Sequence, residues 1–357
     1  MKYVGIDLHK KIIVLCVVRQ DRTVLQRRRF LCLEPDRIRQ FFGQLGDFQA
    51  VVEATANYEW LVELLLPLAQ KVVLAHPGKL RVIAESVRKS DKVDARILAE
   101  FLALDLIPQA YRPTQRQRDH RVLVRWRVTV SRKRARLKCR IRQVLANYNA
   151  DRSKLFTAEG ADYIKTVKLS EADRFVMRQL QAELKQTHKQ LEQANARLLS
   201  FAKKGGAAEQ QSRRVLRSAP GVGKVTTEVV LAELAGVERF RSSKQVVAYA
   251  GLAPGRRESA GKAVSLGISK QGSKLLRWIL VEAAWSAVRY SPRWKIRYET
   301  LKKRSGSKKA IVAVARKLLV MLVAMLRTGQ MYQEPGSPTA DTASEPGTEK
   351  KPRSGAA

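Results

Sequence analysis

The sequence has little cysteine, little histidine and no uninterrupted apolar run long enough to span a membrane. Its three cysteines, Cys16, Cys32 and Cys139, are scattered and odd in number, which argues against a disulfide framework and against a zinc site. The four histidines show no spacing typical of metal ligands. No signal peptide is expected. The most apolar late segment, residues 310–326, is interrupted by two cations, which predicts a packed helix and not a membrane span. These absences indicate a reduced, cytoplasmic protein.

Acidic residues are scarce in two thirds of the chain. The 357 residues carry a formal net charge of +37, and 45% of them are hydrophobic, enough for two or three domains. Residues 1–110 are nearly balanced, at +4, whereas the remainder carries +33. A balanced N-terminal domain joined to a strongly basic body indicates a nucleic-acid partner, and no membrane partner is expected.

Four acidic residues of the first domain lie in apolar surroundings. Asp7 and Glu53 each end an apolar strand. Asp91 and Asp94 are three residues apart near the start of an amphipathic helix, so their carboxylates share one helical face. Four converging carboxylates would form an oxygen-rich site suited to Mg²⁺ or Mn²⁺. The alternative is that they are helix-cap and strand-end acids facing solvent.

The first domain, residues 1–110, has the pattern of an α/β fold. Apolar runs bounded by turn residues predict strands at residues 2–7, 11–19, 23–30, 51–53 and 71–76, and helices at residues 35–45 and 58–69. This order is that of an RNase H-like (RuvC-like) fold, in which the first and fourth strands are neighbours. Asp7 and Glu53 would then lie at the same edge of the sheet.

A basic amphipathic helix is predicted over residues 112–142, which hold 13 Lys and Arg residues and one acid. So many cations with almost no compensating carboxylate favour contact with a nucleic-acid backbone, although a solvated helix face is the alternative. The candidate contacts are Arg125, Arg132, Arg134, Arg136 and Arg140.

A second long helix is predicted over residues 170–201, with apolar residues at alternating intervals of three and four. This spacing predicts a coiled-coil seam. The seam could pair with the basic helix or with a second subunit. We expect residues 111–212 to form a basic-helix and coiled-coil linker.

A Pro-Gly-Val-Gly-Lys segment then separates two apolar helices and resembles a helix-hairpin-helix. Gly221 and Gly223 would let the backbone approach a phosphate, and Lys224 would add a charge there. The alternative is an ordinary interhelical turn.

A small-residue loop around Ser259 carries Arg256, Arg257 and Lys262. A serine among such cations could attack a phosphodiester, because the cations lower its pKa and stabilise charge on phosphorus. Most loops of this composition are only turns, and Ser265 or Ser269 could be the nucleophile instead. Residues 213–330 are expected to form the helix-hairpin-helix domain with this serine, and residues 333–357 a disordered tail.

Taken together, these motifs resemble the bacterial insertion-sequence transposases of the IS-one-ten (IS110) family, the DEDD transposases. The resemblance rests on Gly5-Ile6-Asp7-Leu8-His9-Lys10, Val52-Glu53-Ala54-Thr55, Ser90-Asp91-Lys92-Val93-Asp94, Pro220-Gly221-Val222-Gly223, Tyr249-Ala250-Gly251-Leu252-Ala253-Pro254 and Gly267-Ile268-Ser269-Lys270-Gln271-Gly272. It covers nearly the whole chain up to the tail. Ser259-Ala260-Gly261 matches the Ser-Ser-Gly turn that carries the family's catalytic serine, with alanine at the second position.

The resemblance implies a DNA recombinase that excises and inserts its own mobile element in the bacterial nucleoid. It implies that Asp7, Glu53, Asp91 and Asp94 form a metal-binding tetrad and that Ser259 is the nucleophile. It also implies a structured bridge RNA as a guide, double-stranded donor and target DNA, and a homo-oligomer, a dimer or tetramer. The residues alone leave two alternatives: a Holliday-junction-type metal-dependent endonuclease and a non-catalytic RNA- or DNA-binding scaffold.

Overall fold

The computed structural model describes residues 1–55, 57–83, 91–259 and 262–334, and for residues 81–83, 91–94, 256–259 and 262–265 it describes the backbone alone. The chain divides into two compact units, Met1–Arg112 and Pro113–Ala357, which are described separately below. Among the described helices, none is long and apolar enough to cross a membrane. The expected disordered tail lies almost entirely outside the described residues.

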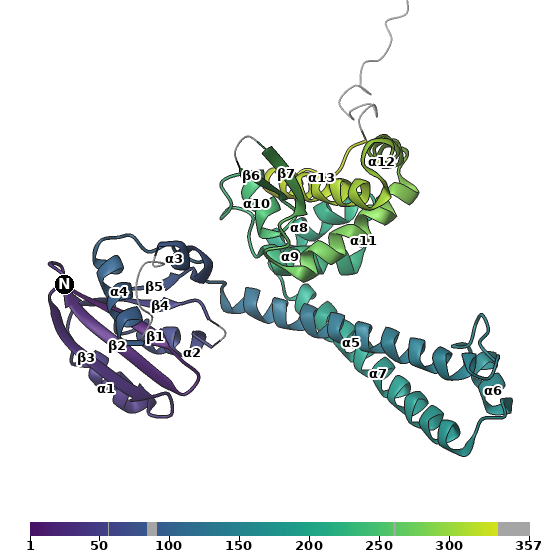
Figure 1. The fold of residues 1–357 in the computed structure, drawn as a ribbon, viewed down its shortest axis with the longest axis horizontal. Coiled ribbons are helices and arrows are strands. Elements are labelled where there is room, and N and C mark those ends of the chain that lie inside the picture. The colour runs from purple at the N-terminus through teal and green to yellow at the C-terminus, as the bar shows by residue number, and fades with distance from the viewer. Residues whose placement is uncertain (56, 84–90, 260–261, 335–357) are drawn as a thin grey trace, which may run out of the picture. The chain divides into compact units, whose positions relative to one another are not determined.

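The first unit contains a mixed sheet of five strands. They are β1 (Lys2–Leu8), β2 (Ile12–Arg19), β3 (Val24–Leu31), β4 (Phe48–Glu53) and β5 (Lys71–Ala75), in the spatial order β3-β2-β1-β4-β5 (Figure 1). β2 is antiparallel to β1 and β3, whereas β4 is parallel to both β1 and β5. The prediction that the first and fourth strands are neighbours is therefore confirmed, and the sheet is compatible with an RNase H-like fold.

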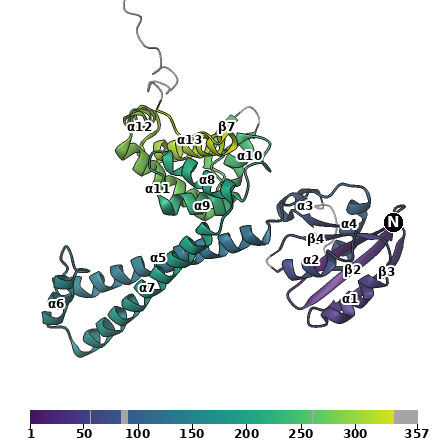
Figure 2. The same cartoon turned by 180° about the vertical axis from the view of Figure 1, so that it is seen from behind.

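Helices cover both faces of this sheet (Figures 1 and 2). On one face, α1 (Pro35–Gly43) and α2 (Glu59–Leu65) enclose a core with alternate residues of β1 and β2. On the other face, α4 (Asp91–Ala103) packs its alanines and leucines against β1, β2 and β4. A short helix, α3 (Pro77–Ile83), follows β5. Because side chains alternate along a strand, each residue of β1 can be assigned to one of these faces.

The second unit begins with two long helices that pack against each other, α5 (Gln115–Ala146) and α7 (Glu171–Lys203), joined through α6 (Ala158–Thr166). Thr114 and Gln117 form a complete capping box at the start of α5. The residues of α7 that were predicted to form a seam face the interior, and Phe201 among them is half-buried. The others are buried: Met177, Leu180, Leu184, Thr187, Leu191, Ala194 and Leu198. Within one chain, the partner of this seam is the basic helix α5.

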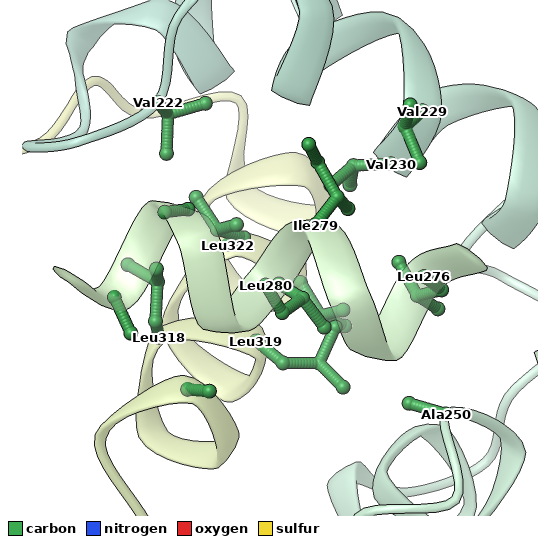
Figure 3. Close-up of a cluster of buried hydrophobic side chains, with 14 of the residues drawn as sticks. Val222, Val229, Val230, Ala250, Leu276, Ile279, Leu280, Leu318, Leu319 and Leu322 are labelled. Carbon is green, nitrogen blue, oxygen red and sulfur yellow. The ribbon is translucent and has the colours of Figure 1, made fainter. Parts of the chain in front are cut away.

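The C-terminal part of the second unit is a helical domain with one β-hairpin. Its elements are α8 (Ala207–Ser218), α9 (Lys224–Leu234), α10 (Ser243–Tyr249), β6 (Pro254–Ser259), β7 (Lys262–Ile268), α11 (Lys274–Tyr290), α12 (Pro292–Ser305) and α13 (Ser307–Thr328). Figure 3 shows the core that joins them, in which Leu276, Ile279 and Leu280 of α11 meet Leu318, Leu319 and Leu322 of α13. The prediction that residues 310–326 form a packed helix is confirmed.

Two features of this domain differ from the sequence prediction. The segment around Ser259 was expected to be a loop, but it forms the antiparallel hairpin β6–β7. Arg256, Arg257 and Glu258 are not residues typical of strands, and the pairing with β7 overrides their local preference. Helix α12 was also not predicted, because lysines and arginines interrupt its apolar pattern.

Candidate functional site

The sheet brings two of the predicted acids to neighbouring strand ends. Ile6 of β1 lies opposite Val52 of β4, so the next residues along these parallel strands are Asp7 and Glu53. Neighbouring strands are about 4.8 Å apart. The side chains of Asp7 and Glu53 are both half-buried. Two acceptor-only groups therefore stand side by side at the carboxyl ends of two inner strands of the sheet.

Both acids lie on the sheet face that α4 covers. Asp7 alternates with Gly5, and a Cβ at Gly5 would overlap with the carbonyl oxygen of Ala95 and the backbone nitrogen of Ala99. Glu53 alternates with Val51, which packs in a cluster with residues of α4. Because glycine has no Cβ, it is the only residue type at position 5 that lets the backbone of α4 come this close to β1.

The direction of α4 brings its first turn towards the strand ends. The last residue of α4, Ala103, accepts a hydrogen bond of 3.0 Å from the side chain of Gln20, which follows the end of β2 beside the start of β1. Ala95 lies over Gly5. The helix thus runs antiparallel to β1, and its first turn, which begins at Asp91 and contains Asp94, lies towards the end of β1 that carries Asp7. The side chains of Asp91 and Asp94 lie outside the described residues.

His9 is a neighbour of this site that the sequence reasoning passed over. Its Nε2 lies 2.9 Å from Oδ2 of Asp7, and the amide of Asn57 donates a hydrogen bond of 3.5 Å to the His9 carbonyl oxygen. The turn between β1 and β2, in which the His9 backbone donates to Ile12, bends the chain so that residues two apart can meet. An acid followed two residues later by histidine at a strand end is the signal that could have identified this pair.

The acceptor chemistry of these residues fits a divalent metal. Among the described side chains no group of three histidines, cysteines or acids forms a metal site. Asp7 and Glu53 nevertheless supply carboxylate oxygens, which hard cations such as Mg²⁺ and Mn²⁺ prefer. Two adjacent carboxylates repel each other unless a cation or a proton neutralises them.

The predicted nucleophile lies at the end of the hairpin. Ser259 is the last residue of β6 and pairs with Lys262, the first residue of β7. Arg256 pairs with Ser265, and Arg257 pairs with Val264. The two residues of the turn and the side chains around it lie outside the described residues. The alternative serines occupy other places: Ser265 is within β7, and Ser269 follows that strand.

Backbone contacts hold the base of this hairpin. The backbone nitrogen of Ser269 donates a hydrogen bond of 2.8 Å to Ala253, and that of Lys270 donates one of 3.1 Å to Gly251. The Arg277 guanidinium donates one of 3.1 Å to the Ala250 carbonyl oxygen. The two segments that carried the C-terminal resemblance therefore bind each other, and together they position β6 and β7 on α10 and α11.

The predicted nucleic-acid contacts on α5 fall into different environments. Arg125 donates two hydrogen bonds, of 2.9 and 3.2 Å, to the carboxylate of Glu233, which is only 1% exposed. These hydrogen bonds raise the pKa of Arg125 above its ordinary value, and burial opposes them only in part. This differs from the expectation of a phosphate contact, because the charge of Arg125 is matched within the protein.

The other candidates on α5 remain available to a polyanion. Arg132 lies over the ring of Trp278, 5.0 Å from its centroid. Arg134 is half-buried, and Arg136 and Arg140 are exposed. No carboxylate among the described side chains forms an ion pair with any of these four.

The turn between α8 and α9 gives its glycines separate roles. Gly221 has φ +77°, and a Cβ there would overlap with the backbone of Ala283 and Ala287 on α11. Packing against α11 therefore explains why residue 221 is a glycine, and a phosphate contact is not needed to explain it. Gly223 and Lys224 are exposed at the start of α9, and a Cβ at Gly223 would meet no described atom within 4 Å.

A buried polar network under this turn was not anticipated. Arg213 is 3% exposed and donates to both carboxylate oxygens of Glu228, at 2.9 and 3.2 Å, while Nε2 of His120 lies 2.8 Å from the same group. Burial raises the pKa of Glu228, but the hydrogen bonds from His120 and Arg213 and the charge of Arg213 outweigh it, so the pKa lies below its ordinary value. The network links α5, α8 and α9 and is structural.

Comparison with known proteins identifies the chain. A family model described as a DEDD-type IS110 transposase matches residues 4–150, and one described as the transposase IS116/IS110/IS902 family matches residues 213–299. The transposase for insertion sequence element IS1111A of Coxiella burnetii is 26% identical over 93% of this chain and 92% of its own length. The transposase for insertion sequence element IS1328 of Yersinia enterocolitica is 24% identical over 79% of this chain and 82% of its own. The pilin gene-inverting protein of Moraxella bovis is 24% identical over 93% and 98%, respectively.

The acid-bearing sheet and these matches define the class of the protein as a transposase, an enzyme that cleaves and rejoins DNA. The chain belongs to the IS110 family of insertion-sequence transposases. A non-catalytic scaffold is therefore not retained as an alternative. Membership of the DEDD group implies dependence on a divalent metal ion.

Proposed function

We propose that this transposase excises and integrates its insertion sequence with two chemical centres. One is the acidic tetrad Asp7, Glu53, Asp91 and Asp94 in a RuvC-like domain of residues 1–110. The other is Ser259 on the hairpin of a C-terminal domain of residues 213–330. The similarity to a pilin gene-inverting protein supports a reaction that rejoins DNA strands as well as cutting them.

The observation that carries the proposal is the pairing of β1 with β4 beneath α4. This pairing brings Asp7 and Glu53 to adjacent strand ends, and the close contact at Gly5 directs the first turn of α4 to the same edge. Three elements distant in sequence would thus supply acids to one region. If these acids were only helix caps and strand ends that face solvent, the fold would have no need to bring them to the same end of the sheet.

Asp7, Glu53, Asp91 and Asp94 would hold Mg²⁺ or Mn²⁺. When bound, such an ion stabilises charge that develops on phosphate oxygens and lowers the pKa of a nearby hydroxyl. The protein's own part is to orient the carboxylates. His9 keeps Oδ2 of Asp7 in a defined direction through their 2.9 Å contact.

In the proposed covalent step the Ser259 hydroxyl oxygen forms a bond to phosphorus, and the bond from phosphorus to one deoxyribose oxygen breaks. The serine proton passes to a carboxylate or water, and the departing oxygen takes up a proton to become a free hydroxyl. Rejoining is the reverse reaction with a different hydroxyl. Arg256, Arg257 and Lys262 on the same hairpin would stabilise the charge on phosphorus.

The basic body would bind donor and target DNA duplexes together with a structured guide RNA. The net charge of +33 on residues 111–357 supports a partner with many phosphates. Arg134, Arg136, Arg140 and Lys224 are the proposed contacts for the phosphate backbone. We further propose that α5 and α7 form a coiled coil, that α8 and α9 form a helix-hairpin-helix, and that the active assembly is a homo-oligomer.

The proposal is tested with DNA carrying the element's ends, the purified protein and Mg²⁺. Quenching the reaction with denaturant should trap DNA covalently attached to the wild-type protein. Ser259→Ala removes one oxygen and should form no adduct while still binding DNA, and Ser265→Ala and Ser269→Ala serve as matched controls. An adduct that persists in Ser259→Ala and disappears in a control would identify another nucleophile. Cleavage by the wild type without any adduct would favour the water-using endonuclease.

A further inference from the structure

A groove beside α5 combines Arg136, one of the proposed backbone contacts, with features that those contacts do not use. It has a volume of about 570 Å³ and is lined by Thr129, Arg132, Ala135 and Arg136. Thr129, Arg132 and Arg136 recur at intervals of three and four, so they lie along one stripe of the helix, and Ala135 lies beside that stripe. Arg125 belongs to the same stripe, and its ion pair with Glu233 fixes this side of α5 against α9.

An aromatic ring lies beside one of the residues that line the groove. Trp278 of α11 is 37% exposed, and the guanidinium of Arg132 lies over its ring, 5.0 Å from the centroid. Arg132 is itself exposed, and no carboxylate among the described residues forms an ion pair with it. A guanidinium that lies over a partly exposed indole ring offers a cation and an aromatic surface against which a further ring can stack.

We propose that this groove binds an unpaired nucleotide. Its base stacks on Arg132 and continues the Trp278–Arg132 pair, and its phosphate meets Arg136. A base inside a duplex is stacked on its neighbours and cannot reach such a surface, whereas unpaired bases stack on aromatic rings and on arginine planes. The proposal rests on the proposed nucleic-acid binding of the basic body, and it adds single-stranded character at one place.

The position of the groove suits a strand that is opened near the hairpin. Ser273, the residue that caps α11, donates a hydrogen bond of 2.9 Å to the same Glu233 that holds Arg125. Ser273 directly follows the segment, residues 267–272, that supports the base of β6 and β7. Trp278 lies five residues further along α11, which is little more than one helical turn. Both DNA strands separated during transposition and loops of an RNA guide offer unpaired nucleotides.

The test measures the affinity of the full chain for labelled oligonucleotides by fluorescence anisotropy, without any cleavage assay. The probes are single-stranded DNA, single-stranded RNA and a DNA duplex of equal length. Trp278→Ala should weaken single-strand binding by at least about fivefold and leave duplex binding unchanged. Arg132→Lys keeps the charge but removes the plane, so it should have a similar effect without changing the salt dependence.

Trp285→Ala is the matched control, because Trp285 is 43% exposed and lies two turns further along α11, where it contacts Tyr298 instead of α5. This variant should bind all probes as the wild type does. The tighter of the two single-stranded probes identifies the source of the nucleotide. If Trp278→Ala and Arg132→Lys leave single-strand binding unchanged, or weaken duplex binding equally, the groove is not a site for an unpaired base.

Discussion

The two units of the chain use their recognisable motifs in different ways. In the first unit, Asp7 and Glu53 stand at strand ends where their carboxylates can take part in chemistry. In the second, residues of the motifs between Tyr249 and Arg277 contact each other through backbone hydrogen bonds and through one from the Arg277 guanidinium to a backbone oxygen. A motif can therefore mark either the reacting groups or the support of a loop that carries them. The predictions below separate these two uses.

The largest effect is expected at the acid site. Asp7→Asn keeps the shape of the side chain but removes its charge, and should lower the rate of strand cleavage by at least about a hundredfold. Asp94→Asn should act in the same way, and DNA binding by both variants should persist. Asp36→Asn is the matched control, because Asp36 is exposed on α1 and pairs with Arg39. Cleavage by Asp7→Asn at the wild-type rate would contradict a catalytic role for this acid.

In the second unit the largest effect should be on stability. Glu228→Gln leaves the buried Arg213 with Glu209 as its remaining carboxylate partner, so it should lower the free energy of unfolding by about 3 kcal/mol, the lower end of the range for breaking a buried ion pair. The pKa of Glu228 is lowered in the folded protein, so this carboxylate stabilises the fold above its unfolded pKa, and that contribution is lost as the pH falls. Denaturant unfolding at neutral and acidic pH should show a variant less sensitive to acid than the wild type. An unchanged midpoint at neutral pH would show that the network contributes nothing.

The two glycines of the turn between α8 and α9 should differ in how well they tolerate an added side chain. Gly221→Ala should lower the free energy of unfolding by about 1–3 kcal/mol or more, because its φ is positive and a Cβ would meet α11. Gly223→Ala, where no described atom lies within 4 Å of the added Cβ, should cost less than about 1 kcal/mol. Thermal unfolding of the two variants measures the difference, and equal destabilisation would refute the packing explanation.

The smallest effect is expected for the salt dependence of DNA binding. Replacing Arg136 and Arg140 by Gln should lower the slope of log K against log salt by about 0.9 for each phosphate that the protein no longer neutralises. Arg125→Gln should leave the slope nearly unchanged and instead lower the free energy of unfolding by about 1–3 kcal/mol, because the buried Glu233 loses its cation and keeps only the Ser273 hydroxyl as a side-chain donor. The reverse outcome would make Arg125 the phosphate ligand.

Features set by local pattern could be predicted from the sequence. The apolar runs that end at Asp7 and Glu53 identified β1 and β4, and the alternating intervals in α7 identified its buried residues. Both patterns are carried by neighbouring residues and survive in the fold because a buried face needs them. The neighbouring positions of β1 and β4 followed from the order of elements.

Features that depend on distant residues could not be predicted. In the sequence Arg125 resembles the other arginines of α5. No residue near it indicates that it pairs with Glu233, which lies more than a hundred residues away. The hairpin that carries Ser259 depends on pairing with β7, which outweighs the local preference of its charged residues. The contact between His9 and Asp7 depends on the shape of one turn.

The central claim is that the transposase joins itself to DNA through Ser259 of the hairpin. The most direct measurement is mass spectrometry of the peptide that remains attached to a nucleotide after the denatured wild-type adduct is digested with protease and nuclease. The account predicts a nucleotide on the peptide that contains Ser259, with fragment ions that place it on that residue. Attachment at Ser265 or Ser269, or cleavage of DNA with no attached peptide, would contradict it.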